Sequence, residues 1–180
     1  IPAVCMELTG TVLRGREFEP ITGRVVVEDG TITAVEEAAV ESDDIICPAF
    51  VNAHTHIGDS LAKEAGRGLR LEELVAPPDG LKHRLLRAAD RDEQIEAIRR
   101  SLSFMADTGT AAYVDFREGG VDGVALLEAA AEDSPLESVV LGRETVDAMH
   151  ASDGFGASGA NDAVFDAQRT ATREAGKIFG

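Results

Sequence analysis

From residue 45 onward, short apolar runs of strand length alternate with segments of helical periodicity. The apolar runs at 45–51, 110–116 and 138–141 predict strands, and the passages 153–159 and 177–180 predict a further short strand and the start of another. Strands separated by helices pair in parallel through right-handed crossovers. This part of the chain is therefore restricted to a parallel α/β fold, either an open wound sheet or a (β/α)8 TIM-type barrel.

The clearest helical signal begins at Asp90. Asp90 and Glu93 stand as the N-cap and the third helical position, a pairing typical of a capping box. Ile95 and Leu102 then lie on one helical face before Gly109 ends the helix. Further helices are predicted over residues 71–75, 81–89, 122–132 and from Asn161 or Asp162 to Ala175.

The residues before 45 follow a different pattern, in which apolar and polar side chains alternate as in half-buried strands. Asp29-Gly30 separates the β-rich runs 24–28 and 31–36, and this dipeptide favours a tight hairpin because both residues tolerate positive φ. We expect residues 1–45 to form a small all-β, sandwich-like N-terminal piece, and residues 46–180 to form the α/β part.

The length of the α/β part bears on its completeness. A (β/α)8 barrel needs about 250 residues, and the whole chain has 180. If the architecture is a barrel, residues 46–180 supply its first half, from strand 1 to the start of strand 5. We expect a truncated barrel that continues beyond Gly180, because half a barrel exposes unpaired strand edges.

The chain is strongly acidic, with 33 Asp and Glu against 17 Lys and Arg and a net charge of −16. Such a surface repels phosphates and anionic lipids, so we expect a small-molecule substrate and neither nucleic acid nor a membrane as partner. A homo-oligomer stays open. Only three of the basic residues are lysines, an imbalance that indicates a halophilic protein, because molar salt screens repulsion between surface carboxylates.

Cys5 and Cys47 are the only cysteines. Nothing near Ile1 resembles a signal peptide, and no apolar run is long enough to span a bilayer. These features predict a reduced, cytoplasmic compartment. We expect both thiols to be small buried apolar groups rather than a disulfide or metal ligands.

Two histidines lie two positions apart where the first predicted α/β strand ends. Side chains at positions i and i+2 of a strand share one face, so His54 and His56 should converge while Thr55 points away. Two imidazoles directed at one point suit zinc or another borderline divalent ion. The alternative is a pair of hydrogen-bonded polar residues at a strand end.

Residues 48–56 read Pro-Ala-Phe-Val-Asn-Ala-His-Thr-His. This segment resembles the amidohydrolase superfamily of metal-dependent hydrolases, in the branch of cytosine-deaminase-like and chlorohydrolase-like enzymes. There the first barrel strand ends in Pro-Gly-Phe-Val-Asn-x-His-x-His, and Ala49 replaces the usual Gly. The resemblance covers most of the chain in topology and about a dozen residues in motif.

The resemblance implies that His54 and His56 bind one divalent metal ion, with zinc expected and iron as the alternative. It also implies a third ligand, His, after strand 5, an Asp after strand 8 that is both ligand and general base, and an acid/base Glu near the later His. We expect all of these beyond residue 180, so no catalytic general base is identified in this sequence.

The reaction implied is hydrolysis by a metal-activated water of a C–N bond other than a peptide bond, in an amide, an amidine or the exocyclic amine of a heterocycle, or of a C–halogen bond. A deaminase is one such enzyme. The alternative is a non-catalytic barrel module, or pseudoenzyme, with a role in assembly or ligand binding. An open wound-sheet protein without a metal is the third option.

Other polar residues follow the predicted strands and should share the edge with the histidines. Arg143 and Glu118 are candidate substrate-binding residues, because a guanidinium can clamp an anionic or carbonyl group. The alternative is a structural ion pair of Arg143 with Glu118 or Glu144. Asp59 and Ser60 are expected to cap the segment after His56, and the alternative is that they reach the metal shell. Residues 58–90 are long enough for a substrate lid or a subunit contact. The other residues in this group are Asp115, Arg117 and Ser158.

Overall fold

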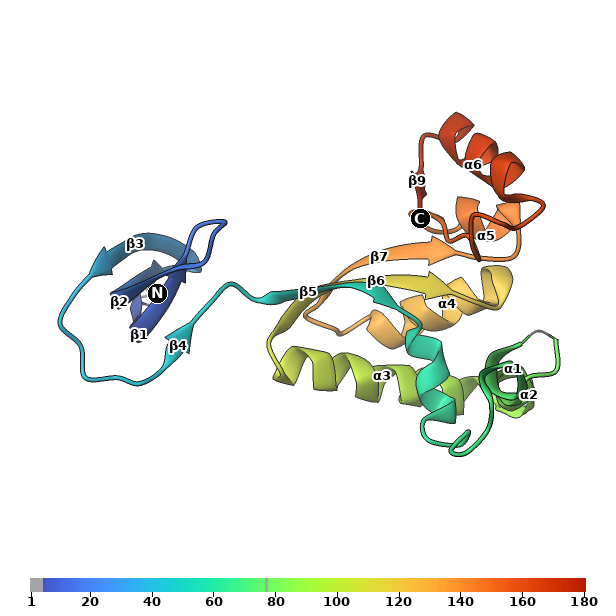
Figure 1. The fold of residues 1–180 in the computed structure, drawn as a ribbon, viewed down its shortest axis with the longest axis horizontal. Helices are drawn as coiled ribbons and strands as arrows, with labels where there is room; N and C mark the ends of the chain where they lie inside the picture. Colours follow the sequence, from blue (N-terminus) through green and yellow to red (C-terminus); the bar gives the residue numbers. More distant parts are fainter. Residues whose placement is uncertain (1–4, 77) are drawn as a thin grey trace. The chain divides into compact units, whose positions relative to one another are not determined.

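The computed structural model describes residues 5–76 and 78–180 (Figure 1). The chain divides into two compact units, one up to Ala49 and one from Phe50 to Gly180. Each unit has its own sheet and core. In the described part of the chain, no helix combines the length and the apolar character needed to cross a membrane.

The first unit is a four-stranded sheet in the order β3-β2-β1-β4. Antiparallel pairing joins β1 to β2 and β2 to β3, whereas β4 lies parallel to β1. Val12, Ile21 and Val25 form its small core. The strands are β1 (Cys5–Arg14), β2 (Glu19–Glu28), β3 (Thr31–Glu37) and β4 (Ile45–Ile46).

The hairpin predicted at Asp29-Gly30 is present. Asp29 has φ of 48° and Gly30 has φ of 79°, as a turn with two left-handed central residues requires. The prediction of an all-β segment matches this sheet. The second layer that a sandwich needs is absent from residues 5–49, the described part of this unit.

The prediction of one continuous strand over 45–51 is wrong. Ile45 and Ile46 pair with Thr11 and Val12 of β1, and the next strand begins only at Phe50. Pro48 lies between the two strands and has no N–H to donate to a ladder. The boundary between the two units accordingly lies between residues 49 and 50 in the sequence, four residues after the predicted boundary at 45.

The prediction that both thiols are buried is also wrong. Cys5 and Cys47 are free and exposed. Cys5 is the first residue of β1, and Cys47 directly follows the two-residue strand β4. Both positions lie at strand ends, outside the small core of the unit.

The second unit contains five strands in the order β5-β6-β7-β8-β9, and every neighbouring pair is parallel. All carboxyl ends therefore lie at the same edge of the sheet. The strands are β5 (Phe50–Thr55), β6 (Thr110–Arg117), β7 (Glu137–Gly142), β8 (Gly154–Phe155) and β9 (Ile178–Phe179). The chain is thus a mixed α/β protein with a parallel sheet, and these strands do not by themselves close a barrel.

Helices α3 (Arg91–Asp107) and α4 (Gly120–Ala131) pack on each other and on β6 (Figure 1). Ile98, Leu102, Tyr113 and Leu127 are almost fully buried in this core. The capping box predicted for α3 is confirmed, since Asp90 accepts a hydrogen bond of 2.8 Å from the N–H of Glu93. The other helices are η1 (Ile57–Ala62, a 3-10 helix), α1 (Leu71–Val75), α2 (Leu81–Ala88), α5 (Val146–His150) and α6 (Phe165–Glu174).

One predicted helix begins later than expected, and two short helices were not predicted. Helix α6 begins at Phe165 rather than after Asn161 or Asp162. The carboxylate of Asp162 accepts from the N–H of Val164 within a turn, so it stabilises the turn before the helix and not the helix start. Helices η1 and α5 were not predicted from the sequence.

Candidate functional site

The two histidines converge as predicted. His54 is the second-to-last residue of β5 and His56 directly follows the strand, and their Nε2 atoms are 3.3 Å apart. The ring of His54 also stacks on Phe116 of β6, with centroids 4.3 Å apart and an interplanar angle of 20°. An aromatic ring from the neighbouring strand therefore supports the histidine pair from one side.

The separation of these two nitrogens fits a shared metal ion. Zinc bonds to histidine nitrogen at about 2.0–2.1 Å, so two nitrogens at tetrahedral angles around zinc are roughly 3.3 Å apart. The observed 3.3 Å equals that value. A hydrogen bond between the two rings would need a similar distance, so geometry alone leaves both arrangements open and metal binding decides between them.

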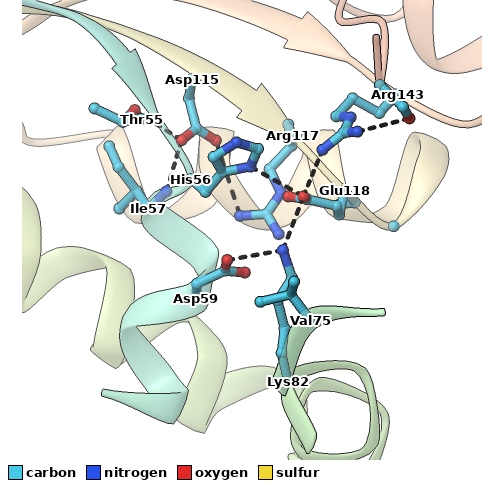
Figure 2. Close-up of polar contacts among 12 residues, drawn as sticks. Thr55, His56, Ile57, Asp59, Val75, Lys82, Asp115, Arg117, Glu118 and Arg143 are labelled. Carbon is cyan, nitrogen blue, oxygen red and sulfur yellow. Dashed lines mark hydrogen bonds and ion pairs between the residues drawn. The ribbon is translucent and has the colours of Figure 1, made fainter. Parts of the chain in front are cut away.

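Thr55 lies between the histidines and points to the adjacent strand. Its hydroxyl oxygen lies 2.9 Å from both the carbonyl of Val114 and the Asp115 carboxylate, and its single proton is shared between these two acceptors. The same Asp115 oxygen accepts from the N–H of Ile57 at 2.7 Å (Figure 2). Asp115 thus contacts both neighbours of His56, the side chain of Thr55 and the backbone N–H of Ile57, and it is completely buried. Burial raises the pKa of Asp115, although the nearby charge of Arg117 partly opposes this.

Arg117 provides the counter-charge for Asp115. It is 3% exposed, its Nη1 lies 3.9 Å from Oδ2 of Asp115, and its Nε donates to the carbonyl of Glu118 at 2.9 Å. The guanidinium packs directly on Gly58, where an added Cβ would lie 1.9 Å from Nη1. A side chain at position 58 would therefore displace the guanidinium from its present position.

Glu118 is the centre of a charged cluster next to His56 (Figure 2). Its Oε1 lies 3.0 Å from Nδ1 of His56, 3.0 Å from Nζ of Lys82 and 2.7 Å from Nη1 of Arg143. Burial would raise the pKa of the Glu118 carboxyl, but the contacts with His56 and Lys82 outweigh burial and hold the pKa well below its usual range. Glu118 is therefore an ionised, buried carboxylate.

Lys82 brings helix α2 to this cluster. Its amine lies 2.8 Å from Asp59 and 3.0 Å from Glu118, with only 12% of the side chain exposed. Burial lowers the pKa of Lys82, but the two carboxylates outweigh it and the pKa lies above its ordinary value. The segment predicted as a lid is thus tied to the edge of the sheet by an ion pair.

The structure brings together most of the residues that the sequence indicated. The alternative considered for Arg143, an ion pair with Glu118, is present, and Nη2 of Arg143 donates to Ser158 at 2.8 Å. Asp59 does not cap the following helix as expected, since η1 has no side-chain cap and Asp59 pairs with Lys82. Lys82 was not predicted, because nothing in its local sequence distinguishes it from a solvated lysine.

The ligand set for a metal is incomplete within the described residues. There, no group of three or more His, Cys, Asp or Glu side chains is arranged to hold an ion. His54 and His56 supply two nitrogens at a suitable spacing, and a catalytic zinc requires a third protein ligand. The two histidines fit part of a metal centre.

Solved structures with a similar fold include two deaminases. The 5-methylcytosine deaminase of Klebsiella pneumoniae, solved with 5-fluorocytosine, is 13% identical with a TM-score of 0.68, over 97% of this chain and 50% of that one. The guanine deaminase of C. acetobutylicum, solved with bound guanine, is 15% identical with a TM-score of 0.53, over 78% of this chain and 36% of that one. At such identities the likeness concerns the fold.

Sequence comparison identifies the family. A "Putative aminohydrolase" of Methanothermobacter thermautotrophicus is 42% identical over 144 residues, which are 76% of this chain and 38% of the relative. The chain thus spans less than half the length of this relative. The model of the Amidohydrolase family matches residues 45–179, which include the whole parallel sheet and both histidines. With that match over most of its length, the chain belongs to the amidohydrolase family.

Proposed function

We propose that this chain is part of a metal-dependent hydrolase that cleaves a C–N bond through a metal-activated water. The observation that carries the proposal is the 3.3 Å separation of the Nε2 atoms of His54 and His56 at the carboxyl edge of a parallel sheet. Active sites of α/β barrels are assembled at this edge. Membership of the amidohydrolase family, whose members generally use a divalent metal, supports the same function.

His54 and His56 would hold the metal through their Nε2 atoms. A bound zinc or iron ion would supply a hydroxide near neutral pH, because it lowers the pKa of its bound water to about 7. The chain's own residues orient the ligands: Phe116 supports the ring of His54, and Asp115 holds the backbone around His56. In this proposal, the general base and the remaining ligands would come from residues other than these 180.

The substrate class we propose is an amino-substituted heterocycle or a small amide or amidine. The two structural neighbours are deaminases solved with 5-fluorocytosine and with guanine, which supports a heterocyclic amine. Arg143 and Glu118 form an ion pair with each other. Contact of either side chain with a substrate stays a prediction. In a chlorinated heterocycle, the leaving halide would take the position that the amino group has in a heterocyclic amine.

We also propose the wider setting expected from the sequence. The complete protein would form an eight-stranded barrel of the TIM type, and the N-terminal sheet would belong to a small composite β domain. It would act on a small molecule in the cytoplasm, without nucleic acid or membrane partners, and a homo-oligomer stays open. A non-catalytic barrel module is the competing function.

Turnover tests the proposed reaction directly. The protein expressed from its complete gene should release ammonia from at least one member of a panel of aminopyrimidines, aminopurines and small amides. Chelator treatment should abolish the release, and added zinc or iron should restore it, because the hydroxide depends on the metal. Bound metal without ammonia release from any member of the panel would favour the non-catalytic module.

The acidic, lysine-poor composition leads us to propose operation at high salt. Raising KCl from 0.1 to 2 M should raise the unfolding midpoint by roughly 5 °C, which is about 2 kcal/mol for a chain of this size. The cause is screening of repulsion within a net charge of −16. KCl is preferred to sulfate, which stabilises folded proteins through exclusion from their surface. An unchanged midpoint would contradict the proposal.

A further inference from the structure

The contact between Glu118 and His56 concerns the histidine ring and not a substrate. Its Oε1 lies 3.0 Å from Nδ1 of His56, whereas Nε2 of His56 faces Nε2 of His54. A carboxylate can only accept in such a contact, so the proton of the ring lies on Nδ1. The lone pair of a neutral His56 ring is then on Nε2, on the side where the two histidines meet.

Two cations hold Glu118 in this position. Lys82 from helix α2 and Arg143 from the end of β7 contact the same Oε1 atom, at 3.0 and 2.7 Å. The Glu118 side chain is 9% exposed, and its buried Oε2 has no hydrogen-bond partner among the described residues. A carboxylate bound by three donors on one oxygen has little freedom to turn toward a substrate.

The cost of burying this charge needs an explanation. A buried carboxylate is expensive unless it is paired, and here two cations from separate elements compensate it. The third donor is the ring of His56, through Nδ1. Carboxylates placed in this way behind a histidine fix its tautomer and ring orientation and strengthen its bond to a metal.

From this geometry we infer that Glu118 is a positioning residue for a metal ion, which directs Nε2 of His56 at the ion while Lys82 and Arg143 keep Glu118 in place. The inference rests on the proposed function, since it assumes that His56 is a ligand. It assigns Glu118 to metal affinity rather than to substrate recognition. It also gives Lys82, and with it helix α2, a part in holding the metal centre together.

Zinc affinity tests this inference without any activity measurement. The protein expressed from its complete gene is titrated with zinc in competition with a chromophoric chelator. Glu118→Ala should bind zinc 10- to 100-fold more weakly, the loss typical of a removed partner of a metal-binding histidine. Glu118→Gln keeps the side-chain volume and an oxygen that can accept from Nδ1, so it should retain part of the affinity.

Glu144→Ala is the matched control. Glu144 has the same charge and also lies at the edge of the sheet, but it accepts from the N–H of Gly119 and does not contact His56. Its zinc affinity should stay within twofold of the unsubstituted protein. The visible absorption of the cobalt-substituted protein, which reports ligand geometry, should change in Glu118→Ala and not in Glu144→Ala.

The outcomes separate the inference from the proposed function. Equal zinc affinity in the unsubstituted protein and both Glu118 variants would overturn the inference and leave the metal site intact. An equal loss of zinc affinity in Glu118→Ala and Glu144→Ala would overturn it as well. The loss would then come from removing one negative charge near the site and not from the contact with His56. If the unsubstituted protein binds no zinc, iron or cobalt, the proposed function fails and the inference fails with it. If Glu118→Ala does not fold, Glu118→Gln decides: weaker zinc binding than in the unsubstituted protein supports the inference, and equal binding overturns it.

Discussion

Replacing His54 and His56 together by alanine is expected to reduce hydrolysis to the uncatalysed rate, even with zinc in excess. Both Nε2 atoms that face each other at 3.3 Å are lost in this variant. A catalytic zinc needs three protein ligands, so the remaining ligands cannot hold it in a reactive geometry. The loss should be about a million-fold or more, which is the size of ordinary enzymatic accelerations. Steady-state ammonia release measures it.

His150→Ala is the control for this double variant. His150 is an exposed residue at the end of helix α5. Its replacement should leave the rate unchanged within about twofold. A double variant that keeps a tenth of the original rate would show that the reaction does not depend on these two imidazoles.

Asp115→Ala is expected to lower the free energy of unfolding by about 3–5 kcal/mol, the usual result of leaving a buried charge unpaired. The Asp115 carboxylate accepts from Ile57 and Thr55 and faces the buried guanidinium of Arg117. Alanine removes the acceptor of the Ile57 N–H and one of the two acceptors of the Thr55 hydroxyl, and it leaves Arg117 without its counter-charge. Urea unfolding followed by circular dichroism gives the free energy by linear extrapolation.

Asp115→Asn should be milder than Asp115→Ala. The amide oxygen of asparagine can still accept from the N–H of Ile57. Burial raises the pKa of the Asp115 carboxyl, which means that this site favours a neutral group over a charged one. Asp122→Ala, at an exposed position in α4, should change stability by less than about 0.5 kcal/mol. If Asp115→Ala and Asp122→Ala are equally stable, Asp115 does not anchor the segment around His56.

The features that could be predicted from the sequence depend on short-range rules. The hairpin at Asp29-Gly30 follows from the φ angles that these two residues tolerate, and α3 follows from its capping box and one apolar face. The convergence of His54 and His56 follows from the two-residue period of a strand. Each of these patterns is complete within a few residues.

The features that could not be predicted depend on distant partners. Ile45 and Ile46 are apolar and strand-forming wherever they pair, and their partner in β1 is about 34 residues away in sequence. Lys82 contacts Glu118 across 36 positions, and no period in the sequence connects a lysine on α2 with the end of β6. The tertiary fold, and not the local pattern, decides such contacts.

The role of individual polar residues at the sheet edge was equally hard to predict. Aspartate is a common helix-capping residue, but Oδ2 of Asp59 lies 2.8 Å from Nζ of Lys82 and the side chain does not cap η1. Asp115 was expected at the edge, but only its burial shows that it anchors the backbone around His56. A shared edge predicts which residues meet without predicting how they pair.

The metal content of the purified protein tests the central claim most directly. The protein from its complete gene, incubated with zinc and then freed of unbound ions, should retain close to one equivalent of metal per chain. The His54→Ala/His56→Ala variant, treated identically, should retain less than a tenth of that amount, provided that its circular dichroism spectrum matches that of the unsubstituted protein. Equal metal content in the two proteins would mean that the paired imidazoles do not bind the ion.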